Sequence, residues 1–179
     1  MKKFAALFLA AILMAVSFSG CGTPPTLGFT HEEFGQMLQQ RIDSGGYSWD
    51  LTDMKYSIDE SSGSGRYHCN IGSDIAFVIT CTNGKSGPVE QVFFMQNYKS
   101  YKTNTHATTQ FRFIVEQIYE ICHPDFTQEE KDAFKASILG AMDKEPDDQI
   151  TVFKQDGTEY SYLDMKESYD VTFSADALS

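Results

Sequence analysis

The sequence has little positive charge: 14 lysine and arginine residues stand against 25 aspartate and glutamate residues, for a net charge of −11. Because nucleic-acid binding requires a basic surface to neutralise phosphates, this balance argues against a nucleic-acid partner. Long apolar runs are also scarce, and a mean hydropathy of −0.32 excludes a polytopic membrane protein. Cysteine and histidine number four each, with no C-x-x-C or H-E-x-x-H spacing, so we predict neither a metal nor a cofactor.

Apolar residues are nevertheless numerous enough to form a core. Of the 179 residues, 41% are hydrophobic and 13% are aromatic, which excludes global disorder. This length suits one domain of ordinary size and is short for two.

The first 20 residues have the order of a targeting segment. Lys2 and Lys3 precede an almost wholly apolar stretch at 4–18, which is shorter than the roughly 20 residues that a transmembrane helix needs. Residues 18–21 (FSGC) follow and resemble a bacterial lipobox, with Phe where Leu is usual. The resemblance implies cleavage before Cys21 and attachment of diacylglycerol to it. An ordinary secretory signal that ends beside a cysteine, or a retained signal anchor, are the alternatives.

We therefore predict a signal peptide at 1–20, a lipidated Cys21 with a short tether at 21–28, and a single domain at 29–179. Loss of the two lysines takes the net charge from −11 to −13, so the mature protein has no electrostatic attraction to anionic lipid. The acyl chains must then provide the attachment. The predicted location is the cell membrane, with the domain facing outside the cytoplasm.

The remaining chain predicts an α+β domain with helices on one face of an antiparallel sheet. Capping boxes at 30–33 and 127–130 each begin an amphipathic helix, and an apolar stripe at 111–122 indicates another. In the helix after residue 127, the residues expected to face inward are Ala133, Phe134, Ile138 and Met142. Alternating apolar residues predict strands at 47–58 (one bent strand or two short ones), 67–71, 75–82, 89–95, 150–154, 158–163 and 169–173. The predicted order is α-β-β-β-β-α-α-β-β-β.

Two turns are recognisable between these strands. A tight turn at Gly72-Ser73 would place Cys69 opposite Ala76, and Asp156-Gly157 is typical of a type I′ hairpin turn.

Some segments of the sequence resemble one another. FTHEE at 29–33 recurs as FTQEE at 126–130, and YSW at 47–49 resembles YSY at 160–162. An internal duplication would produce this pattern, and so would the chance recurrence of capping boxes and amphipathic strands.

The mature chain as a whole resembles small, uncharacterised lipoprotein domains of Gram-positive anaerobes. The motifs that carry the resemblance are an F-T-x-E-E-F helix start, a G-G-(Y/W) strand start and a K-x-G-x-V-x-x-V hairpin. They occur here at 29–34, 45–47 and 85–92, the last with an inserted Pro88. These motifs are structural, and the resemblance implies no known activity.

Three cysteines remain after the predicted processing, in a compartment where disulfides persist. The predicted register sets Cys69 too far from Cys81 for a bridge. Cys81 lies on the expected core face, and a helix that returns alongside brings Cys122 closer. If a bridge forms, we expect Cys81–Cys122; the alternative is three buried free thiols.

No familiar catalytic pattern is present. G-x-S-x-G is absent, and the four histidines are scattered, two of them at helix boundaries where solvated histidine is ordinary. His68-Cys69 and Cys122-His123 suggest zinc, but adjacent strand residues point to opposite faces, so we predict no metal site.

Carboxylates are numerous without forming a recognisable site. The acidic stretch at 143–148 indicates a solvated loop, because Pro146 breaks calcium-loop spacing. A carboxylate pair drawn from Asp50, Asp53, Asp59 and Glu60 leaves glycoside hydrolysis open.

The most site-like feature of the mature chain is a pair of tyrosines in a polar stretch. Tyr98 and Tyr101, beside Lys99 and Lys102, form a candidate interaction patch. We therefore expect a non-catalytic binding module whose partner is an envelope protein or a surface polymer. A small cell-envelope hydrolase and a ligand-binding accessory of a transporter are the alternatives.

Overall fold

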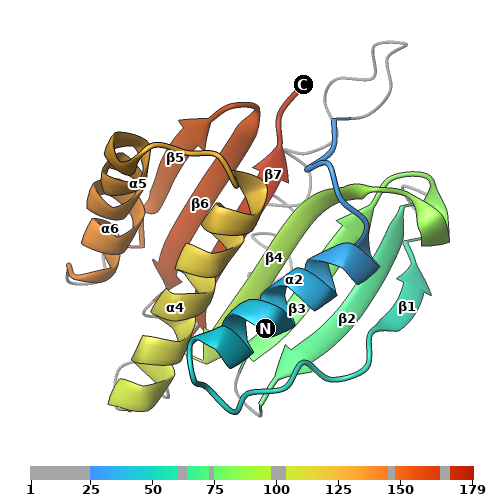
Figure 1. Cartoon of the computed structure of the whole chain (residues 1–179), viewed down its shortest axis with the longest axis horizontal. Helices are drawn as coiled ribbons and strands as arrows, with labels where there is room; N and C mark the ends of the chain where they lie inside the picture. Colours follow the sequence, from blue (N-terminus) through green and yellow to red (C-terminus); the bar gives the residue numbers. More distant parts are fainter. Residues whose placement is uncertain (1–24, 60–63, 73–74, 98–103, 145–147, 166–169) are drawn as a thin grey trace.

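The structure, a computed structural model, describes residues 25–179 apart from 60–63, 73–74, 98–103, 145–147 and 166–169 (Figure 1). The predicted signal peptide, Cys21, and the stretch that holds Tyr98 and Tyr101 lie outside the described residues.

The elements follow the predicted order. The helices are α2 (His31–Ser44), α4 (Thr105–Cys122) and α5 (Gln128–Phe134), which continues through a π-helical turn η3 (Lys135–Leu139) into α6 (Gly140–Met142). The strands are β1 (Lys55–Ile58), β2 (Gly65–Ile71), β3 (Ile75–Cys81), β4 (Val89–Asn97), β5 (Ile150–Gln155), β6 (Thr158–Met165) and β7 (Asp170–Ala177), with a 3-10 turn η2 (Gly84–Ser86) between β3 and β4. This arrangement confirms the predicted α+β class.

Two antiparallel meanders meet in one sheet of seven strands, in the order β1-β2-β3-β4-β7-β6-β5. Strands β1 to β4 form one meander and β5 to β7 the other. They join through the antiparallel pair β4 and β7, in which Phe94 lies opposite Phe173. The last strand of each meander therefore lies at the centre of the sheet (Figure 1).

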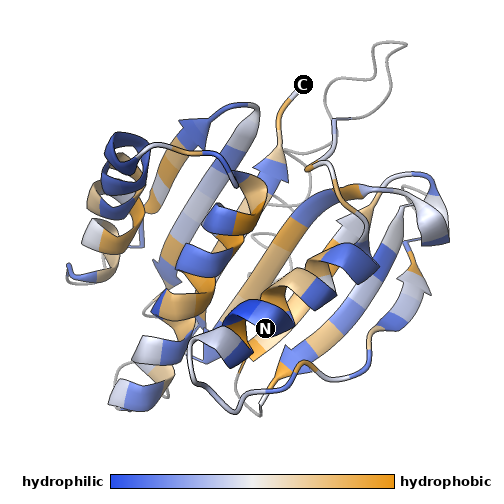
Figure 2. Cartoon of the chain, viewed as in Figure 1, coloured by the Kyte–Doolittle hydropathy of each residue, from blue (hydrophilic) through white to orange (hydrophobic). Residues whose placement is uncertain are grey.

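Among the described residues, the helices cover one face of this sheet (Figure 1). Alternate residues along β3 point toward them, and Ile75, Phe77, Ile79 and Cys81 are all buried. The same alternation appears as bands of hydropathy along β2 in Figure 2. At the centre of the core, the Phe94 ring lies 4.9 Å from Phe77, 4.7 Å from Phe111 and 5.4 Å from Phe173, measured between ring centroids.

Both predicted capping boxes are present. At the start of α2, the Thr30 hydroxyl accepts from the Glu33 N–H, and the Glu33 carboxylate accepts from the Thr30 N–H. Thr127 and Glu130 repeat the arrangement at the start of α5. The FTHEE and FTQEE segments therefore have the same structural role in the two halves of the chain, because each begins a helix. The YSW and YSY segments do not correspond, because Tyr160 lies within β6 whereas Tyr47 precedes the first strand.

Three details differ from the expectations. Cys69 pairs with Phe77 and not with Ala76, because Ile71 pairs directly with Ile75 and the connection is one residue longer than a two-residue turn. Of the predicted strand at 47–58, only β1 forms a ladder, while Leu51 makes an isolated bridge. In the third helix Ala133, which precedes the π-helical turn, is exposed, whereas Leu139 at the end of that turn is buried beside Ile138.

The turn between β3 and β4 requires a glycine for close approach. A Cβ atom on Gly87 would lie 1.5 Å from the carbonyl oxygen of Thr82.

We expect Gly87→Ala to lower the free energy of unfolding by about 1–3 kcal/mol, because the turn must open. In helical Gly140, a Cβ atom meets nothing closer than 3.8 Å, so Gly140→Ala should raise stability by about 0.5–1 kcal/mol. Denaturant unfolding of both variants tests this; equal effects would contradict it.

Candidate functional site

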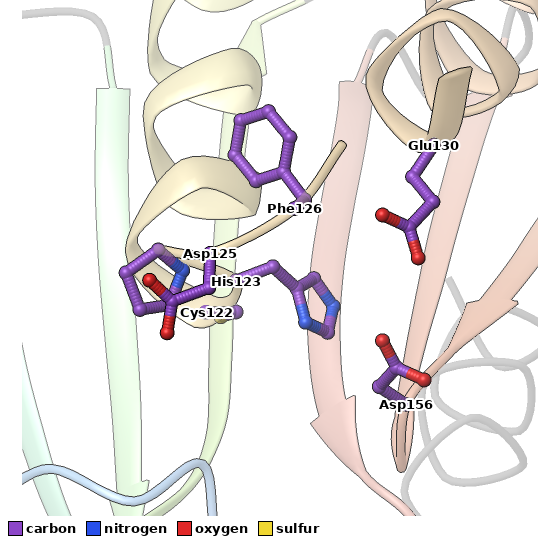
Figure 3. Close-up of a pocket in the computed structure, with 7 residues that line it drawn as sticks. Cys122, His123, Asp125, Phe126, Glu130 and Asp156 are labelled. Atoms are coloured by element: carbon purple, nitrogen blue, oxygen red, sulfur yellow. The ribbon is translucent and has the colours of Figure 1, made fainter. Parts of the chain in front are cut away.

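A hollow of about 330 Å³ lies where the end of α4, the start of α5 and the turn between β5 and β6 come together (Figure 3). Three of the seven residues around it are acidic. The residues that line it are Cys122, His123, Pro124, Asp125, Phe126, Glu130 and Asp156. We call this feature the acidic hollow.

Local sequence signals place each wall of the acidic hollow. Helix α4 stops at Cys122 because the residue before Pro124 is disfavoured in helical geometry, and His123 takes φ −132° and ψ 74°. The capping box at Thr127 then starts α5 and fixes Glu130. Asp156 and Gly157 have φ angles of +43° and +79°, which confirms the predicted type I′ turn and puts Asp156 at its tip.

His123 is the most buried polar group at this site. It is 8% exposed, its ring lies 5.3 Å from Tyr119 and 5.8 Å from Tyr160, and its Nε2 atom has no hydrogen-bond partner. Burial lowers the pKa of His123, while the charges of Asp156 and Glu130 oppose the shift. The ring is therefore neutral at neutral pH, and an unsatisfied buried nitrogen costs about 1–3 kcal/mol.

Cys122 is not an activated thiol. Burial raises its pKa to about 12, although the Tyr160 hydroxyl beside it lowers the pKa in part. Burial likewise raises the pKa of Cys69 and Cys81 to about 11. A nucleophilic cysteine must be a thiolate, so the Cys122-His123 pair has no catalytic activation in this conformation.

The three cysteines are free thiols in the structure. Cys81 lies on β3, whereas the thiol of Cys122 lies beside Tyr160 of β6. Strands β4 and β7 separate these two strands, which amounts to about 14 Å. The structure therefore does not contain the Cys81–Cys122 bridge, because a disulfide needs Cα atoms within about 7 Å.

The expectation that histidines at helix boundaries are solvated is wrong. His31 at the start of α2 is 9% exposed, and its ring stacks on Tyr67 at 3.6 Å. His123 at the end of α4 is buried as described above. His68 and Cys69 do lie on opposite faces of β2, the first exposed and the second buried.

The second notable feature is the sheet face that the described helices leave open. Strand pairing aligns its side chains in rows, and one row across six strands consists of Asn70, Ala76, Met95, Thr172, Leu163 and Ile150. The neighbouring row consists of His68, Val78, Phe93, Ser174, Ser161 and Val152. We call the apolar members of these two rows the open-face patch: Ala76, Val78, Phe93, Met95, Ile150, Val152 and Leu163.

The open-face patch reaches the edge of the sheet at β5. Ile150 and Val152 are 58% and 45% exposed, the largest apolar exposures of the described strands apart from Ile58. β5 is the outermost strand, and within the described residues nothing pairs with its outer backbone edge. An unpaired edge with exposed apolar side chains readily accepts another strand.

Two carboxyl groups come together beside this patch. Glu90 lies at the bulge in the β3–β4 pairing, and burial together with the charge of Asp176 raises its pKa. Burial also raises the pKa of Asp176, although the Ser174 hydroxyl donates to it at 2.7 Å and the Gln91 amide donates as well. Paired carboxyl groups with raised pKa values can act as general acids, so this pair is also what a hydrolase would use.

The carboxylates singled out from the sequence lie elsewhere. Asp59 forms an ion pair with Arg66 at 2.5 Å, and Asp50 and Asp53 are exposed in the segment before β1. Glu60 lies outside the described residues. Within the described part of the chain, no three histidine, cysteine or carboxylate side chains are placed to hold a metal ion.

Comparison with known proteins adds no functional assignment: no family model, curated protein or solved structure matches this chain. In the described part of the chain, no helix is both long and apolar enough to cross a membrane.

The partly buried carboxyl group of Asp176 gives a pH test. A carboxyl group whose folded pKa is raised favours the folded state when protonated, so its contribution to stability is lost as pH rises through that pKa. We expect Asp176→Asn to raise the melting temperature at pH 7 relative to wild type and to remove this difference near pH 4. Exposed Asp132→Asn on α5 is the control. If the melting temperatures of Asp176→Asn and wild type changed in parallel from pH 4 to 7, the raised pKa of the Asp176 carboxyl group would be contradicted.

Proposed function

We propose that this chain is a lipid-anchored, extracytoplasmic binding module that docks a partner protein on the open-face patch. The observation that carries the proposal is the alignment of apolar side chains into two rows that end at the unpaired edge of β5. Apolar side chains gathered on an open sheet face, here in two groups on β3–β4 and β5–β6 with Thr172, Ser174 and Ser161 between them, are typical of interaction sites.

The N-terminal segment supports the anchoring part of the proposal. The basic, apolar and small residues before Cys21 have the lipobox order, and two or three acyl chains hold a protein stably where one would not. The tether at 21–28 is short, at most about 25–30 Å when extended, so the domain would lie near the membrane surface.

The chemistry of the patch favours a protein over a polysaccharide. Aliphatic side chains such as Ile150, Val152 and Leu163 bury apolar area against another protein, whereas sugars require polar groups and exposed rings. The net charge of −11 opposes a second copy of this chain and favours a neutral or basic partner. An extended segment of such a partner would pair with β5 and place alternate side chains on the patch.

The two alternative functions, a transporter component and a hydrolase, each predict a different structural feature. The described strands form one continuous sheet, so this part of the chain lacks the two lobes typical of solute-binding components of transporters. A hydrolase is favoured only by the Glu90 and Asp176 pair, and both Glu90→Gln and Asp176→Asn would have to abolish any hydrolysis found.

The anchoring prediction is tested at Cys21. We expect Cys21→Ser to release the domain from the membrane fraction or to leave an unprocessed precursor, because no acyl chain can be attached. Fractionation and metabolic labelling with palmitate measure both effects. A Cys21→Ser protein that is processed and retained like wild type would exclude the lipoprotein interpretation.

The docking prediction is tested in cells by a photoreactive amino acid at Val152. We expect an adduct with one neutral or basic protein, and its loss in the Ile150→Lys variant, whose exposed position leaves the core intact. The same probe at Asp132, exposed on α5, is the control and should not give this adduct. An adduct between two copies of this chain would show that the patch binds a second copy and would contradict the proposed partner. The absence of any Val152 adduct would refute docking.

A further inference from the structure

We propose that the acidic hollow binds a primary ammonium group, carried either by a small amine or by a lysine side chain. This inference does not depend on docking at the open-face patch, because the acidic hollow is formed by the ends of α4 and α5 and by the β5–β6 turn.

The charge of the hollow is the first argument. Asp125, Glu130 and Asp156 line it, and among the described residues no lysine or arginine does. Lys131 lies near, with its ammonium 5.1 Å from the centroid of the Phe126 ring, but it forms an ion pair with Glu120. The lining therefore attracts a cation and repels an anion.

The second argument is independent of the carboxylates. His123 is more than nine-tenths buried, its Nε2 has no partner, and its ring is directed between Glu130 and Asp156 (Figure 3). In the neutral tautomer that carries its proton on Nδ1, the Nε2 atom is an acceptor, and a ligand with N–H donors would satisfy it. Polar groups with unmet hydrogen bonds that converge on a hollow are typical of ligand sites.

The residues that line the hollow offer several hydrogen-bond acceptors. The Oε2 atom of Glu130 accepts from Thr127, whereas Oε1 takes no part in those bonds. Asp156 is exposed at the tip of its turn. Glu130 and Asp156 therefore offer carboxylate oxygens, and His123 an imidazole nitrogen, to N–H donors that enter the hollow.

The shape and the walls favour an organic cation. No set of three described side chains is placed to hold a metal ion, whereas about 330 Å³ accommodates an alkyl ammonium. Pro124 and Phe126 provide apolar walls for the methylene groups of such a ligand.

Two substitutions remove charge without disturbing the fold. Asp156→Asn leaves Asn-Gly at the turn, which is the preferred type I′ pair. Glu130→Gln keeps the capping box, because glutamine serves the same position as glutamate. The matched control is Asp143→Asn, which removes one carboxylate at the far end of α6.

The experiment is calorimetric titration of the full chain in neutral detergent with n-butylammonium and with acetyl-Gly-Lys-Gly-amide, with n-butanol as the uncharged analogue. We expect at least one of the two ammonium probes to bind and n-butanol not to bind. Asp156→Asn and Glu130→Gln should each weaken binding at least 10-fold, while Asp143→Asn should change it less than 2-fold.

Tighter binding of the peptide would identify a lysine side chain as the source of the ammonium group, and tighter binding of n-butylammonium would identify a free amine. Failure of both ammonium probes to bind, equal binding of n-butanol, or binding unaffected by the two substitutions would overturn the proposal.

Discussion

The alternation of side chains along seven antiparallel strands is the constraint on which the rest of the molecule depends. Alternate residues of β3 are fully buried against the helices, so its other residues, such as Val78, must lie on the opposite face. The described helices bury one face only, and the sheet therefore has a core side and an open side. Stability comes from the first, and the proposed docking surface is a consequence of the second.

The fold was largely predictable from the sequence because its signals are local. Thr30 with Glu33, Thr127 with Glu130, and Asp156 with Gly157 each set their geometry within a few residues, and all three form as predicted. The details that failed depend on one-residue differences. An extra residue in the β2–β3 connection moved Cys69 from Ala76 to Phe77, and a π-helical turn places Leu139 in the core beside Ile138.

The acidic hollow could not be predicted in the same way. Its three main groups come from the end of one helix, the start of the next and a hairpin tip, and only tertiary packing brings them together. Each carried a local signal that already had a structural explanation: His123 before a proline, Glu130 in a capping box, Asp156 in a turn. Because each signal already had a structural explanation, none of them indicated the proposed binding site. The open-face patch was similarly hidden, since the rows depend on how β4 pairs with β7.

The pairing of β4 with β7 also has a consequence for how the chain folds. Phe94 and Phe173 lie opposite each other although 79 residues separate them in sequence, and this contact joins the two meanders. As the chain is synthesised from its N-terminus, the first meander emerges with the inner backbone edge of β4 unpaired until β7 follows. Formation of the complete sheet is therefore a late, high-contact-order event. Until then the exposed backbone edge of β4 is where a chaperone would bind, or where two nascent chains would exchange strands.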